Sequence, residues 1–231
     1  ADVDVIEPCN AQQRNGVGAS GGCEADFAIA GTGEALRVFT TRPDTMFGAT
    51  YMVLSPEHPV IERFAQRIEN IRDLRAYREQ AAAKSDFERA EMQKDKTGVE
   101  VIGLKAVNPA TGKEIPIWVS DYVLMGYGTG AIMAVPGHDE RDWEFAKAFS
   151  LPIVEVVAGG DVTQQAYTEI DDGVIVNSGF LDGLSVKQAQ EAMIAWLEQR
   201  GLATRKINYK LRDWVFSRQR YWGAVSYKHL R

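Results

Sequence analysis

The segment 126–145 constrains the chain most, because a glycine-rich loop, an apolar run and a polar helix start follow one another within a short span. An apolar run at 131–135 predicts a buried strand, which Pro136-Gly137 ends. His138 and Asp139 then begin a helix, so polar side chains crowd the point where the strand passes into a helical turn. The loop before the strand holds three glycines, at which backbone can approach a ligand closely: Gly126, Gly128 and Gly130.

Two acidic residues in the predicted first helical turn allow more than one interpretation. Asp139 is typical of a helix N-cap, and Asp142 in the first turn favours the helix dipole. For Asp139, capping and chemistry stay open as alternatives. Asp142 lies beside the open glycine loop and is also well placed to hold a substrate ammonium group.

Three other kinds of site fit the sequence poorly. The chain has three histidines, and His58 and His229 lie in contexts unrelated to His138, so we expect no metal site. A serine nucleophile fits poorly, because the Gly-x-Ser-x-Gly pattern at Gly18–Gly22 lies in a glycine-rich, linker-like stretch rather than at a strand-to-helix turn. The glycine loop lacks the sixth-position glycine and the directly following helix of a dinucleotide loop.

A second polar segment, 40–48, joins two predicted strands. It carries three hydroxyls, one guanidinium and one carboxylate within a few residues, and Pro43 fixes its backbone. On composition alone, ordinary turn and strand hydroxyls are the better explanation. The polar residues are Thr40, Thr41, Arg42, Asp44 and Thr45.

Composition indicates a globular protein of one large or two small domains, since 45% of the 231 residues are hydrophobic. We expect no membrane segment and no secretory signal, and reduced thiols at Cys9 and Cys23 in a cytoplasmic protein. The net charge is −6, yet residues 201–231 hold eight Lys or Arg against Asp213. Such a basic end is compatible with a strip of the protein surface that contacts a polyanion, or with a strip that is only solvated.

Short strands with irregularly interspersed helices predict a mixed α/β domain around a mainly antiparallel or barrel-like sheet. Residues 1–22 are expected to be irregular, and Ser185 and Gly201 to cap and close a helix. The predicted strands are 25–30, 36–40, 49–54, 98–107, 114–119, 131–135, 153–157 and 173–177. The predicted helices are 56–67, 72–92, one from His138 and one over 185–200.

Four segments resemble bacterial leucyl-tRNA synthetase, in the right order and spacing from about Gln13 to Gly223. Segment 38–59 is similar to the family's threonine-rich segment, and 126–145 to the second signature of its editing domain. The pieces 172–179 and 182–184 also match, and 209–223 looks like the return of the chain to the catalytic core.

The resemblance implies hydrolysis of the ester that joins a wrong amino acid, such as Ile, Met or norvaline, to tRNA(Leu). A hydrophobic pocket discriminates one methylene by only ~1–3 kcal/mol, so near-isosteres of leucine are charged and must be removed by a second pocket. The implied fold is the β-barrel-centred editing domain of the class I Val/Ile/Leu synthetases, with peripheral helices.

The resemblance also implies residue roles. Thr45 would be the steric gate against leucine, Asp142 the partner of the substrate ammonium, and Tyr127 a neighbour of the adenosine. Thr40 and Thr41 would contact the terminal adenosine and the reacting ester. No obvious general base is present, so we expect a positioned water, helped by the free ribose hydroxyl. The remaining implied residues are Met133 and Val135 in the side-chain pocket, with Arg42, Asp44, His138 and Asp139 in support.

The family pattern divides the chain into a connecting segment (1–22), an editing domain (23–205), a return segment (206–223) and a divergent or added tail (224–231). The segment Asn15-Gly-Val-Gly-Ala-Ser20 lacks the Trp and Arg usual in the family. No ATP-site signature is present, so we expect no leucine activation. Editing should need no cofactor, with ATP and Mg belonging to the parent enzyme's catalytic domain. Expected partners are the tRNA(Leu) 3′ end and the synthetase core, for a cytoplasmic monomer.

Two rival functions remain. One is a non-catalytic module that holds tRNA ends or a protein. The other is a metal-dependent phosphohydrolase that uses His138, Asp139 and Asp142.

Overall fold

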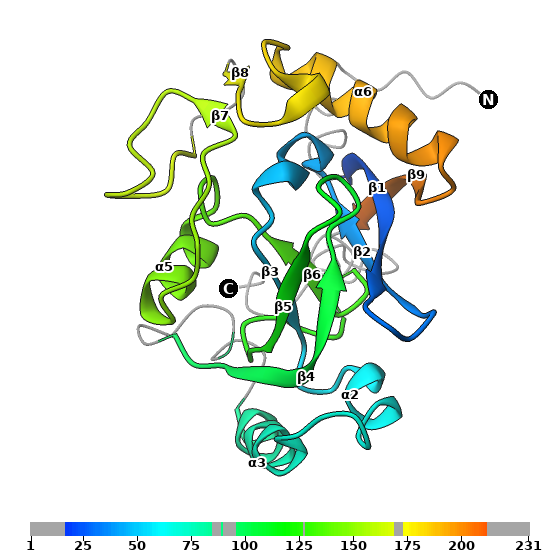
Figure 1. Ribbon diagram of the computed structural model, residues 1–231, viewed down its shortest axis with the longest axis vertical. Helices are drawn as coiled ribbons and strands as arrows, with labels where there is room; N and C mark the ends of the chain where they lie inside the picture. Colours follow the sequence, from blue (N-terminus) through cyan, green and yellow to red (C-terminus); the bar gives the residue numbers. More distant parts are fainter. Residues whose placement is uncertain (1–16, 85–88, 90–95, 127, 169–172, 212–231) are drawn as a thin grey trace, which may run out of the picture. The chain divides into compact units, whose positions relative to one another are not determined.

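The computed structural model describes residues 17–84, 89, 96–126, 128–168 and 173–211 (Figure 1). Contacts divide the chain into two compact units, and Gly22–Arg205 is the one that holds the predicted site. The strands are β1 (Val17–Ile29), β2 (Ala35–Thr40), β3 (Tyr51–Leu54), β4 (Val99–Val107), β5 (Glu114–Val119), β6 (Ala131–Ala134), β7 (Val157–Ala158), β8 (Val174–Ile175) and β9 (Ala203–Leu211). The helices are η1 (Pro43–Gly48), α2 (Pro59–Arg63), α3 (Ile71–Ala82), α5 (Glu140–Ala148), η2 (Gly179–Leu181) and α6 (Val186–Gln199).

The main sheet is mixed, with the order β2-β1-β4-β5-β3-β6, and β9 pairs with β1. Only β3 and β5 run parallel among the described pairs, so the sheet is mainly antiparallel. The mixed α/β prediction is therefore confirmed. The two ends of this order approach each other, since Thr129 Oγ1 donates a hydrogen bond to the Arg37 carbonyl. No ladder between β2 and β6 is present among the described strands, so a closed barrel stays a prediction.

Strand β3 lies between β5 and β6, and both of its faces are apolar and buried. Its side chains alternate in direction, as in any strand. Tyr51 and Val53 pack with Phe145 of α5, while Met52 and Leu54 join the larger core. All four β3 side chains are buried, which explains a continuous apolar run rather than an alternating one. The helix α5 is thereby fixed against the sheet just beside β6.

Several predicted bounds are corrected. Residues 17–22, expected to be irregular, belong to β1, where Gly22 lies so close to Thr40 that a side chain would clash. The helix predicted at 56–67 is reduced to α2. The helix predicted at 72–92 ends at Ala82 in α3, and most of its remaining positions lie outside the described residues. The strands predicted at 153–157 and 173–177 shrink to the two-residue pair β7 and β8.

The predicted caps are confirmed. Ser185 accepts the Gln188 N–H, and Gln188 in turn accepts from the Ser185 N–H, which makes a capping box at the start of α6. Gly201 follows the helix with φ 67°. Cys23 is a free, buried thiol whose pKa burial raises to about 11, and Cys9 lies outside the described residues. In the part of the chain that the structure covers, no helix has the length and apolarity to cross a membrane.

Candidate functional site

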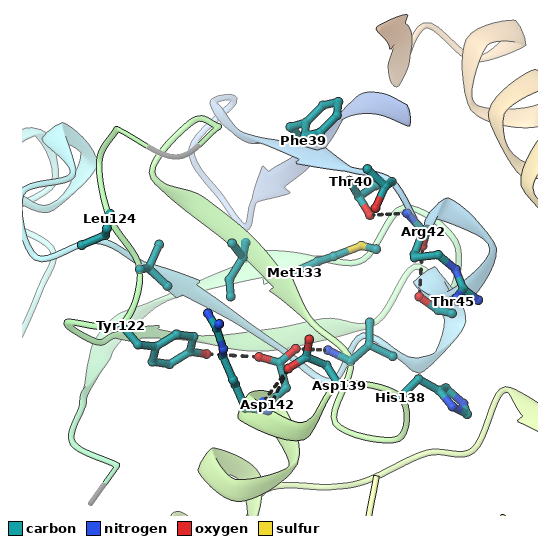
Figure 2. Close-up of a pocket in the computed structure, with 15 residues that line it drawn as sticks. Phe39, Thr40, Arg42, Thr45, Tyr122, Leu124, Met133, His138, Asp139 and Asp142 are labelled. Carbon is teal, nitrogen blue, oxygen red and sulfur yellow. Dashed lines mark hydrogen bonds between the residues drawn. The ribbon is translucent and has the colours of Figure 1, made fainter. Parts of the chain in front are cut away.

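A cavity of about 430 Å³ brings the two predicted polar segments face to face (Figure 2). One wall is the end of β2 with the loop 40–45, and the other is β6 with the start of α5. The loop after β5 supplies a third side. The lining residues are Phe39, Thr40, Thr41, Arg42, Thr45, Tyr122, Val123, Leu124, Ile132, Met133, Val135, His138, Asp139, Arg141 and Asp142.

Hydrogen bonds within the loop 40–45 fix its hydroxyls. Thr40 Oγ1 accepts the Arg42 N–H at 3.0 Å, and Thr45 Oγ1 donates to the Arg42 carbonyl at 3.0 Å. The Arg42 guanidinium makes two hydrogen bonds to the Asp44 carboxylate, of 3.0 and 2.6 Å. Thr45 is therefore held with its methyl and hydroxyl in set directions, which a steric gate requires.

Asp44 supports this loop without lining the cavity. Its side chain is fully buried and its carboxylate is paired with Arg42. Asn108, from the turn after β4, holds the far side of η1 by donating to the carbonyls of Met46 (2.8 Å) and Ala49 (3.2 Å). No local sequence signal points to this role for Asn108, because the contact spans about 60 residues.

Asp142 connects α5 to the end of β6. Its Oδ2 accepts the Val135 N–H at 2.8 Å, and its Oδ1 accepts the Tyr122 hydroxyl at 3.2 Å. The side chain is buried, and this desolvation raises the pKa of Asp142 to about 8, with the negative charge of Asp139 adding to the effect. A cationic group that entered the cavity would favour the ionised form.

Asp139 is the N-cap of α5, which confirms the capping interpretation. Its Oδ1 accepts the N–H groups of Arg141 (2.9 Å) and Asp142 (3.1 Å). It is exposed and also lines the cavity. Asp139 therefore holds the helix start, and both Asp139 and Asp142 line the cavity.

His138 lines the cavity, but its ring nitrogens are occupied by main chain. Its Nε2 accepts the N–H groups of Val156 and Val157, both at 3.0 Å, so Nδ1 carries the proton and donates to the Tyr167 carbonyl at 2.9 Å. Figure 2 shows the ring turned away from Asp142. Gly137 allows this approach, because a side chain there would clash with the Val154 carbonyl. His138 is thus placed as a clamp on the segment 154–167, and the bond at Val156 explains why no long strand forms there.

This clamp predicts an acid-sensitive fold. Burial lowers the pKa of His138, so the folded state favours the neutral ring. The contribution of His138 to stability is complete above the pKa of about 6.5 that histidine has in the unfolded chain. It is lost as the pH falls below that pKa. We expect the free energy of unfolding, measured with urea, to drop less between pH 7.5 and 5 in His138→Gln than in the wild type.

His58 is the matched control for that measurement. It caps α2 by accepting the Val60 N–H, and burial lowers its pKa too, but it lies outside the cavity lining. His58→Gln should remove only the acid-dependent contribution of His58 and leave that of His138 in place. An unchanged pH slope in His138→Gln would show that the clamp does not titrate as described.

The structure brings most of the predicted site residues together. Asp44 stands behind the cavity, and Tyr127 lies outside the described residues. None of the glycines 126, 128 and 130 is among the lining residues, so the expected close approach of this loop to a ligand is not seen in its described part. The cavity residues that the sequence reasoning missed are Phe39, Tyr122, Val123, Leu124, Ile132 and Arg141.

Half of the missed residues had a usable signal. Phe39 and Ile132 adjoin predicted site residues on their strands, and Arg141 adjoins Asp142. Tyr122 had none, because only the fold brings it to Asp142 from 20 positions away. Among the described residues, no three His, Cys, Asp or Glu side chains come together as a metal site would require.

Comparisons with known proteins agree with this geometry. The family model "Leucyl-tRNA synthetase, editing domain" matches residues 14–198. Two relatives called leucine–tRNA ligase are 64% identical over 221 residues (Alkaliphilus oremlandii) and 56% identical over 233 residues (Chloroherpeton thalassium). These matches cover 96% and 99% of this chain, but only 27% and 29% of the relatives.

A solved structure has a similar fold. It is the ternary complex of Agrobacterium radiobacter K84 agnB2 LeuRS with tRNA and LeuAMS, matched with a TM-score of 0.67 and 29% sequence identity. The match covers 90% of this chain and 22% of that one. The chain described here therefore belongs to the family of leucyl-tRNA synthetase editing domains.

Proposed function

We propose that this domain hydrolyses the ester bond of mischarged tRNA(Leu) after transfer, with isoleucyl-, methionyl- and norvalyl-tRNA(Leu) as substrates. One observation carries the proposal: a single cavity presents Thr40, Thr41 and Thr45 on one wall and Asp142 near the other. Membership of the editing-domain family supports the same reaction.

In this proposal the amino acid enters the cavity with its ammonium group at the carboxylate of Asp142. Its side chain lies along Met133 and Val135, and its length is limited by Thr45. Thr40 and Thr41 then contact the ester and the terminal adenosine. Water attacks the ester carbonyl, the bond to the ribose oxygen breaks, and that oxygen takes a proton, which releases free amino acid and intact tRNA.

The lining offers little for strong base catalysis. His138 has both ring nitrogens bound to main chain, and Asp142 is assigned to the ammonium. A water positioned by the threonine hydroxyls and main chain, with help from the vicinal ribose hydroxyl of the substrate, is the mechanism we favour. A tRNA analogue that lacks this hydroxyl should be cleaved more slowly, and cleavage at the full rate would remove the substrate-assisted step.

The deciding experiment is a deacylation assay. Incubation of the protein with isoleucyl- or norvalyl-tRNA(Leu) is expected to release free amino acid, whereas leucyl-tRNA(Leu) should be spared. Binding of the tRNA without release would favour the rival non-catalytic module.

The same assay separates the metal-dependent rival. We propose that editing needs no cofactor, so EDTA should leave the rate unchanged. Both nitrogens of His138 are occupied, which leaves this histidine no lone pair for a metal. Loss of activity with EDTA and its return with a divalent cation would support the phosphohydrolase instead.

The partners we propose are the 3′ end of tRNA(Leu) and the rest of the synthetase. The neighbouring solved structure is itself a complex of a synthetase with tRNA. We further propose a cytoplasmic monomer.

A further inference from the structure

We infer that Tyr122 is a positioning residue for Asp142, whose hydroxyl holds the carboxylate in the orientation that receives the substrate ammonium. The inference rests on the proposed function and concerns a residue outside both signature segments. Tyr122 lies in the loop between β5 and β6, lines the cavity, and donates to Asp142 Oδ1 (Figure 2).

The two hydrogen bonds on Asp142 together restrict how a cation can approach its carboxylate. The Val135 N–H uses one lone pair of Oδ2, and the Tyr122 hydroxyl uses one of Oδ1. Each carboxylate oxygen can accept about two hydrogen bonds, so each retains one position for an incoming cation. Without Tyr122 the carboxylate would be held at one oxygen only and could turn about that bond.

The loop that carries Tyr122 is itself clamped on both sides. Arg89 donates from Nε to the Asp121 carbonyl at 2.8 Å and from Nη2 to the Val123 carbonyl at 3.2 Å. The same guanidinium, which is buried, pairs with Glu57. The Tyr122 ring in turn packs against Phe145 of α5, with 5.9 Å between ring centroids. The hydroxyl is therefore presented by a braced ring rather than by a free surface side chain.

The other ionisable groups around the Asp142 carboxylate do not replace this contact. Asp139 raises the pKa of Asp142 and the exposed Arg141 lowers it. Tyr51 donates to the main-chain carbonyl of Asp142, not to its carboxylate. Burial and the charge of Asp142 raise the pKa of Tyr122 well above its usual value, so the hydroxyl keeps its proton and remains a donor.

The test compares the wild type with Tyr122→Phe, which keeps the ring and removes the hydroxyl. The ionisation midpoint of Asp142 is followed by ¹³C NMR of its side-chain carboxyl, assigned with Asp142→Asn. We expect the midpoint to rise by about one pH unit in Tyr122→Phe, because a hydrogen bond that favours the carboxylate is lost. Tyr167→Phe is the matched control, since this ring lies against Gly159 and Gly160 outside the cavity lining.

A kinetic measurement completes the test. The acid limb of kcat/KM for isoleucyl-tRNA(Leu) reports groups of the free enzyme, so it should shift with the NMR midpoint. At pH 7 we expect kcat/KM to fall about 10-fold, mainly through KM, since the bound ammonium restores the ionised carboxylate.

Unchanged midpoints and an unchanged acid limb in Tyr122→Phe would overturn the role of Tyr122, even with a fully active wild type. A wild type without deacylase activity would instead refute the proposed function, and the NMR midpoint would then decide on Tyr122 by itself.

Discussion

Asp142→Asn is expected to lower kcat/KM for isoleucyl-tRNA(Leu) at least about 30-fold while the fold is retained. Removing one partner of a buried charge pair costs ~2–5 kcal/mol, which corresponds to that loss or more. The amide oxygen can still accept the Val135 N–H, which the carboxylate accepts at 2.8 Å. Single-turnover deacylation measures the effect.

Stability separates the chemical role of Asp142 from a structural one. Burial raises its pKa to about 8, so its stabilising effect is present at low pH and is lost as the pH rises from the unfolded value of about 3.9 towards 8. Ionising the buried carboxyl therefore destabilises the folded protein at high pH. Asp142→Asn cannot ionise and should be no less stable than the wild type at pH 8. Asp142→Ala leaves the Val135 N–H unpaired, which costs ~1–3 kcal/mol. An Asp142→Asn protein with wild-type kcat/KM would refute the ammonium contact.

Local patterns were sufficient for the parts of the fold that local physics determines. The box of Ser185 and Gln188, the turn at Gly201 and the cap at Asp139 each depend on neighbours within four residues. The strands predicted at 153–157 and 173–177 are too long, because the length of β7 and β8 depends on a contact distant in the chain. The N–H groups of Val156 and Val157 bind His138, which lies 18 and 19 positions earlier in the chain.

In the candidate site, too, the features that depend on near neighbours were predictable and those that depend on distant contacts were not. The residues of 40–45 and 133–142 were singled out by their composition and by the family resemblance, and the structure places most of them around one cavity. The two segments face each other because β3 pairs with β6 and comes directly after η1. The contacts of Tyr122 with Asp142 and of Asn108 with η1 join residues far apart in the chain, and no periodicity or turn signal encodes them.

The second large effect is expected at Thr45. Thr45→Ala should hydrolyse leucyl-tRNA(Leu) about 10- to 100-fold faster than the wild type, with little change for isoleucyl-tRNA(Leu). The side chain is 3% exposed and lines the cavity, so removing it opens room beside η1. An overpacked contact costs ~1–3 kcal/mol, and its relief gives an acceleration of this size. Parallel deacylation assays with the two substrates measure the change in specificity.

Two further variants show which part of Thr45 acts as the gate. Thr45→Val keeps the volume but loses the hydrogen bond to the Arg42 carbonyl, whereas Thr45→Ser keeps that bond and loses the methyl group. If bulk excludes leucine, Thr45→Val should still spare leucyl-tRNA(Leu) and Thr45→Ser should cleave it. If the hydrogen bond is what matters, because it orients the side chain, the two results should be reversed. A Thr45→Ala protein that still spares leucyl-tRNA(Leu) would exclude both forms of the gate and would shift the discrimination to Met133 and Val135 on the opposite wall.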